Sequence, residues 1–154
     1  MANVPIEDIK KLREETGAGL TDAKKALVDA GGDFDKAVAA MRAKGFDKAT
    51  KRADKDASAG LIGTYSHDGR IGVIVEVNCE TDFVAKTDEF KELVKDLCLH
   101  IAASDPKDEK ELLEQEFVKD PSITVGDYVK QHIAKLGENI VIRRFSRLAL
   151  GESE

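Results

Sequence analysis

The residues of this chain that are best suited to chemistry lie together in the segment Glu80–Lys86, ETDFVAK. Glu80 and Asp82 are two carboxylates at the end of a predicted strand, and such a pair can bind a cation or exchange a proton. Phe83 follows at a position where a turn normally carries a small polar residue. The segment therefore raises two questions: whether the carboxylates form a reactive site, and whether Phe83 is a core residue or contacts a partner.

A hydrolase that used Glu80 and Asp82 would need further groups, and His67 and Lys86 are the candidates. Acidic residues at strand ends are more often turn formers than catalysts. The chain also lacks the glycine-rich and nucleophile motifs of nucleotide-binding enzymes and hydrolases, since TGAGLTDAK does not have the phosphate-loop spacing. We therefore expect no catalytic residue and a binding function.

The cysteines and histidines do not form a metal or redox motif. Cys79 and Cys98 belong to no C-x-x-C pair, and both lie on apolar faces, which predicts buried thiols. The three histidines lie in different predicted elements without the spacing of zinc ligands. We expect no metal site and no cofactor.

The charge distribution argues against nucleic acid as the main partner. The chain has 154 residues and a net charge of −6, and its residues 60–154 carry 12 Lys and Arg against 19 Asp and Glu. Affinity for nucleic acid comes mainly from basic groups that neutralise phosphates. Only the stretch Lys44–Lys55 offers a basic cluster, and it contains acidic residues too. The sequence has no apolar run long enough for a membrane span and no signal-peptide core, which predicts a cytoplasmic location.

The first 45 residues have the pattern of three short helices with a small core of their own. Gly17 and Gly19 are expected to end the first helix, and Thr21 or Asp22 to cap the second. Asp33 can cap the third helix, which we expect to end at Gly45. The predicted organisation is a helical domain at 1–46, a charged helical linker at 47–59 and a larger domain at 60–154.

Residues 60–154 combine strands and helices. Asp68-Gly69 predicts a hairpin turn, and the strand after it alternates apolar and more polar residues, with Cys79 on the inward face. A helix is predicted from Thr87, a surface connection with about one helical turn at 104–122, and a second helix after it. The final strand contains adjacent Arg143 and Arg144, which break its alternation and favour a bulge. This order predicts the α+β class.

Three blocks of sequence resemble the signature blocks of the translation elongation factor Ts family. The blocks are LREETGAGLTDAKKAL at Leu12–Leu27, VEVNCETDFVAKTDEF at Val75–Phe90 and KLGENIVIRRF at Lys135–Phe145. They occur in the family's order, and with GLIGTYSHDGRIGV the resemblance covers nearly the whole chain.

The resemblance implies a guanine nucleotide exchange factor that binds elongation factor Tu and promotes GDP release. It implies an N-terminal three-helix domain like the ubiquitin-associated domain, followed by a core whose three-stranded antiparallel sheet packs on helices. By the matching motifs, Gly19, Leu20 and Thr21 would dock on the nucleotide-binding domain of the partner. Thr81, Asp82, Phe83 and Val84 would disturb the partner's magnesium site.

The resemblance also implies a homodimer, because short family members pair through their sheets. Longer members have a second subdomain where this chain has only residues 104–121. Ser146 stands where some members carry a cysteine that links the dimer, so no such disulfide is expected here.

Three other functions remain open at this point. The chain could be an adaptor that binds a protein through its helical bundle without nucleotide exchange, a hydrolase using Glu80 and Asp82, or a nucleic-acid binder using Lys44–Lys55.

Overall fold

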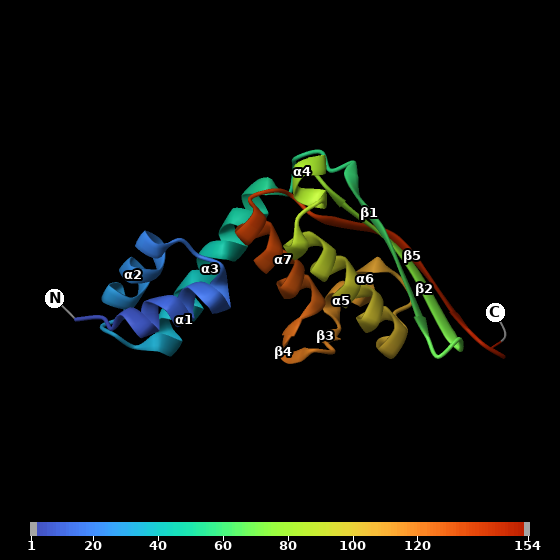
Figure 1. Ribbon diagram of the computed structural model, residues 1–154, viewed down its shortest axis with the longest axis horizontal. Coiled ribbons are helices and arrows are strands. Elements are labelled where there is room, and N and C mark those ends of the chain that lie inside the picture. The colour runs from blue at the N-terminus through green and yellow to red at the C-terminus, as the bar shows by residue number, and fades with distance from the viewer. Residues whose placement is uncertain (1–2, 153–154) are drawn as a thin grey trace.

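The N-terminal part of the chain is a three-helix bundle with its own hydrophobic core (Figure 1). The computed structural model describes residues 3–152. Apolar residues at helical spacing on each helix meet in the centre of the bundle, where Leu12 and Leu27 are completely buried. The three helices are α1 (Ile6–Thr16), α2 (Leu20–Asp29) and α3 (Phe34–Arg52).

The ends of these helices follow the sequence signals only in part. Gly17 adopts the left-handed conformation with φ 70° and ends α1 as predicted. The Asp33 carboxylate accepts a hydrogen bond from the Lys36 N–H and caps α3, also as predicted. The predicted caps Thr21 and Asp22 are wrong, because α2 already begins at Leu20 and no side chain caps it.

The prediction that the third helix ends at Gly45 is wrong, since α3 continues without a break to Arg52. A glycine inside a helix costs only about 1 kcal/mol, and tertiary packing can offset that cost. A Cβ atom at Gly45 would lie 3.1 Å from Ala134 Cβ, so the missing side chain lets helix α7 (Val125–Leu136) approach α3 closely. Ala49, further along α3, is buried in the core of the C-terminal part. The division at 1–46, 47–59 and 60–154 remains a prediction.

The C-terminal part is built on a three-stranded antiparallel sheet with the order β1-β2-β5, which confirms the α+β class. Asp68 and Gly69 have φ values of 53° and 67° and form the predicted turn between β1 and β2. The pairing of β5 with β2 shifts register between Glu76 and Val77, opposite Arg143, so the predicted bulge is present. The strands are β1 (Ala59–His67), β2 (Ile71–Cys79) and β5 (Val141–Ala149).

Helices α5, α6 and α7 cover one face of this sheet (Figure 1). The predicted surface connection at 104–122 is more structured than expected, because it contains a helix and two short strands and buries Leu112 and Phe117. None of the helices in residues 3–152 combines the length and apolarity that a membrane span needs. The further elements are α5 (Asp88–Ser104), α6 (Glu109–Glu114), β3 (Glu116–Phe117) and β4 (Asp120–Thr124).

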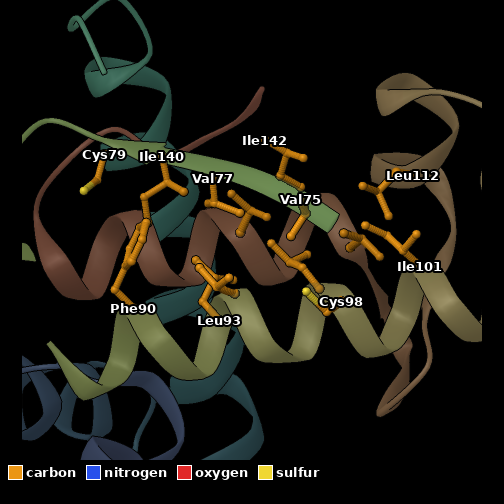
Figure 2. Packing of buried hydrophobic residues seen from close by; sticks show 14 of the residues in the cluster. Val75, Val77, Cys79, Phe90, Leu93, Cys98, Ile101, Leu112, Ile140 and Ile142 are labelled. Carbon is orange, nitrogen blue, oxygen red and sulfur yellow. The ribbon is translucent and has the colours of Figure 1, made fainter. Parts of the chain in front are cut away.

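The main core lies between the sheet and α5, and Figure 2 shows side chains of β2 meeting those of the helix. Alternate residues of β2 point inward, as the period of two predicts, and Phe90 is fully buried against them. Cys79 and Cys98 are buried free thiols, which confirms the prediction. Burial raises the pKa of the Cys98 thiol to about 11, so this cysteine is protonated and inert near neutral pH.

The opposite face of the sheet is not covered by any helix of the described chain (Figure 1). It exposes aliphatic side chains from all three strands, and Leu148 is 74% exposed. A pair between Arg144 Nε and Glu76 Oε1, 2.9 Å apart, lies among them. The exposed aliphatic residues of this outer face are Ile62, Ile74 and Leu148.

Candidate functional site

Phe83 projects from a short helix that joins the sheet to α5. This helix, α4 (Asp82–Ala85), has only four residues. Its N-cap Thr81 accepts a hydrogen bond from the Val84 N–H, and Ala85 is buried at the other end. The Phe83 side chain is 87% exposed, so it is not a core residue. Its exposure agrees with the sequence expectation, while its contact with a partner remains a prediction.

The residues around Phe83 differ in exposure. Asp82 is exposed like Phe83, whereas Thr81 and Val84 are half-buried and connect α4 to the core. The four predicted site residues therefore divide into an exposed pair and an anchoring pair.

Two carboxylates hold the chain just before α4. Glu138, which follows α7, accepts hydrogen bonds from the N–H groups of Glu80 and Thr81, at 3.1 Å and 3.0 Å, and from the Thr81 hydroxyl at 2.7 Å. In the opposite direction, the Glu80 carboxylate accepts a hydrogen bond from the Asn139 N–H. The segments 80–81 and 138–139 are thus connected by side-chain hydrogen bonds in both directions.

Glu80 also connects this region to the end of α3. The Arg52 guanidinium donates from two nitrogens to the two oxygens of the Glu80 carboxylate, with Nε 3.2 Å from Oε2. Burial acts to raise the pKa of Glu80, but the hydrogen bond from the Asn139 N–H and the pair with Arg52 outweigh it. The pKa therefore lies below its ordinary value, and Glu80 is ionised at neutral pH.

The second predicted group, Gly19, Leu20 and Thr21, lies at the start of α2 in the helical bundle. Leu20 is 58% exposed, and Gly19 is the N-cap residue of α2. The structure does not bring this group together with α4, since the two lie on different elements joined through α3 (Figure 1). The bundle nevertheless contacts the C-terminal part, because a Cβ atom at Gly17 would lie 2.8 Å from Lys135 Cγ.

The geometry contradicts a hydrolytic site that combines His67 with Glu80 and Asp82. His67 pairs with Ile71 at one end of the β1–β2 hairpin, whereas Cys79 pairs with Ala59 at the other. The eight residue steps from Ile71 to Cys79 place these ends roughly 26 Å apart at ~3.3 Å per residue. Within residues 3–152, no three potential metal ligands cluster in one place.

The sequence pattern did not predict that Glu138, Asn139 and Arg52 belong to this site. The only local signal was the sequence Gly137-Glu138-Asn139 after a predicted helix, where Gly137 ends α7 with φ 76°. A helix end of this kind does not reveal which distant segment its next residues contact.

An exposed aromatic side chain on a firmly anchored helix is typical of a protein that acts by contacting another macromolecule. Comparison with known proteins identifies the kind of protein. The family described as "Elongation factor TS" matches residues 80–154. The elongation factor Ts of Herpetosiphon aurantiacus is 44% identical over 197 aligned positions, which cover 98% of this chain and 100% of that protein.

Two further relatives carry the same name. The elongation factor Ts of a Thermoanaerobacter species is 45% identical, covering 97% of this chain and 96% of its own length. The elongation factor Ts of Gloeobacter violaceus is 43% identical, and the alignment covers 99% of this chain and 91% of that protein. The chain belongs to the elongation factor Ts family of translation elongation factors.

Proposed function

We propose that this chain is a guanine nucleotide exchange factor that binds GDP-loaded elongation factor Tu and promotes GDP release. The observation that carries the proposal is the exposed Phe83 on α4, in a chain of the elongation factor Ts family. The chain would act without covalent chemistry of its own, and its place of action would be the cytoplasm, where translation elongation occurs.

The proposed mechanism is differential binding. An exchange factor accelerates release when it binds the nucleotide-free partner better than the GDP-loaded one. An aromatic side chain that buries about 150–250 Å² supplies up to roughly 4–6 kcal/mol at ~25 cal/mol per Å². Insertion of Phe83, with Asp82 beside it, into the distorted partner would stabilise displaced groups around the magnesium and phosphate site.

The N-terminal bundle would supply affinity. Leu20 exposes most of its side chain at the start of α2, next to Gly19 and Thr21, and an exposed aliphatic residue there can pack on the partner. Replacing Leu20 by Ala should raise the concentration of the chain needed for half-maximal GDP release and leave the maximal rate unchanged. A reduced maximal rate with unchanged half-maximal concentration would contradict this division of roles.

A homodimer through the outer face of the sheet is the second part of the proposal. Ile62, Ile74 and Leu148 are exposed on three adjacent strands, and an uncovered apolar sheet face favours self-association. We propose no direct contact with nucleic acid and none with a membrane.

The decisive experiment measures the release of a fluorescent GDP analogue from elongation factor Tu at increasing concentrations of this chain. The proposal expects a rate that rises and saturates well above spontaneous release. Binding without acceleration would instead identify an adaptor and overturn the exchange function.

A further inference from the structure

The hydrogen-bond ladder between β2 and β5 stops at Asn78, before α4 begins at Asp82. The last paired residues are Asn78 and Val141, and the segments 80–81 and 138–139 then continue side by side without backbone pairing. Amide groups at such a strand end need other acceptors. The Glu138 carboxylate accepts from the amides of Glu80 and Thr81, and the Glu80 carboxylate accepts from that of Asn139.

Glu138 also fixes the side chain that caps α4. The Thr81 hydroxyl donates to Glu138 Oε2 at 2.7 Å, and the same hydroxyl oxygen accepts from the Val84 N–H at 3.3 Å. A hydroxyl group has a single hydrogen, so donating it to Glu138 leaves its lone pairs for the helix amide. Glu138 therefore holds both the backbone before α4 and its cap.

The direction of Phe83 depends on this support. The residue is 87% exposed, so packing against the rest of the protein does little to orient its ring. A helix of four residues is also too short to be stable by itself. The orientation of the ring thus depends on how the two ends of α4 are held, by Glu138 through Thr81 at the start and by buried Ala85 at the end.

We propose that Glu138 is a positioning residue for nucleotide exchange, because its carboxylate fixes the start of α4 and thereby the direction in which Phe83 meets the partner. This inference rests on the proposed exchange function. Glu138 acts through Thr81 and Phe83 and needs no contact with the partner itself.

The test uses the full chain and measures the release of fluorescent GDP from elongation factor Tu at increasing concentrations of the chain, up to saturation. Glu138→Ala should lower the maximal rate about ten- to a hundredfold, since small misplacements of a contacting group have effects of this size. The concentration for half-maximal release should stay near that of the wild type, because Leu20 and its neighbours are untouched.

Two further variants test whether the position or the charge of the Glu138 carboxylate matters. They keep the test valid if Glu138→Ala does not fold. Glu138→Gln keeps the length of the side chain and an oxygen that accepts from both amides, and its amide nitrogen can donate to the Thr81 hydroxyl oxygen instead of accepting from it. The maximal rate of this variant should therefore stay within roughly threefold of the wild type. Glu138→Asp keeps the charge but shortens the side chain by one methylene, so its carboxylate no longer reaches the amides. The maximal rate of GDP release should therefore be clearly lower than that of the wild type. Equal, wild-type rates for both would overturn the proposal.

Asp127 provides a matched control at the other end of α7. Its carboxylate also accepts a backbone N–H, that of Thr124, in the capping box of that helix. Asp127→Ala should therefore lower the melting temperature without lowering the maximal rate. A similar loss of rate in this control would mean that general destabilisation explains the Glu138 result.

A double variant tests whether Glu138 acts through Phe83. If it does, Phe83→Ala combined with Glu138→Ala should be no slower than Phe83→Ala alone. Losses that multiply would overturn the proposal. A wild-type chain that does not accelerate release would overturn the exchange function itself, whereas an active wild type with an equally fast Glu138→Ala variant would overturn only this inference.

Discussion

Phe83 and Phe90 are the same residue type at nearby positions, yet one is 87% exposed and the other is completely buried. Phe83→Ala should leave the melting temperature nearly unchanged, because the residue is largely exposed in the free protein. The maximal rate of GDP release should fall by one to three orders of magnitude, which corresponds to losing about 1.4–4 kcal/mol of differential binding.

Phe90→Ala is the matched control for this prediction. It should lower the free energy of unfolding by roughly 3–5 kcal/mol, as expected for a phenylalanine removed from a core. Urea unfolding and the release assay together distinguish the two variants. A Phe83→Ala protein that melts much earlier but exchanges at the normal rate would place Phe83 in the core.

The buried His100 makes the stability depend on pH. Its Nε2 lies 2.9 Å from Gln115 Oε1, and its Nδ1 accepts the Val118 N–H at 3.1 Å, so the hydrogen-bonding pattern needs the neutral ring. Burial lowers the pKa of His100 below 6.5, and it lowers that of His132 in the same direction. The unfolded chain therefore binds protons on these histidines before the folded chain does.

It follows that stability is lost as the pH falls below about 6.5, by up to roughly 1.4 kcal/mol per histidine and pH unit until the folded pKa is reached. Urea unfolding measured at about pH 7.5, 6.5 and 5.5 gives this dependence of stability on pH. His100→Asn should be less stable but have a shallower slope. A wild-type stability that does not change over this interval would refute the prediction.

At the scale of elements, the packing of β1 on α5 depends on a missing side chain. A Cβ atom at Gly63 would lie 2.4 Å from Val94 Cγ1 and 3.1 Å from Cys98 Sγ. Gly63→Ala should therefore lower the free energy of unfolding by about 1–3 kcal/mol, since the helix must move away from the sheet.

Gly72 on the neighbouring strand is the control, because a Cβ atom there would meet nothing within 4 Å. Gly72→Ala should change the stability by no more than about 0.5 kcal/mol. Chemical unfolding of both variants measures the two free-energy changes. A Gly63→Ala protein as stable as the wild type would show that the β1–α5 contact adapts without cost.

At the scale of the whole molecule, the proposed dimer can be tested on the outer face of the sheet. The wild type should have about twice the chain mass of 16.8 kDa by light scattering at micromolar concentration. Ile74→Glu places a charge in the middle of this face and should give monomers, because burying an unpaired charge in an interface is unfavourable. Reducing agent should have no effect, since both cysteines are buried free thiols.

Val118→Glu is the corresponding control, since Val118 is another exposed aliphatic residue, 42% exposed, but lies outside the β1-β2-β5 sheet. It should leave the mass of the wild type unchanged. A wild-type chain that remains a monomer would refute the proposed dimer. If Ile74→Glu still forms a dimer, the interface lies outside this face of the sheet.

The features of this protein that depend on neighbouring residues can be predicted from its sequence. The alternation of apolar residues before Cys79 predicts an inward strand face, and the stripe that includes Phe90 predicts the buried side of α5. Asp68-Gly69 predicts the hairpin turn, because few other residue pairs accept positive φ at both positions. Short motifs such as NCETDFVA were also enough to indicate the family.

Contacts between residues far apart in the chain follow from the tertiary fold and have no local signal. Gly45 looks like a helix end in sequence, but it lies inside α3, where Ala134 of α7 comes close to it. His67 and Glu80 looked compatible with one site, but the antiparallel pairing places them at opposite ends of the hairpin. Glu138 and Thr81 are 57 residues apart and carry no pattern that links them. Periodicity and caps act within a few residues, whereas these contacts arise only when the sheet and helices close around a common core.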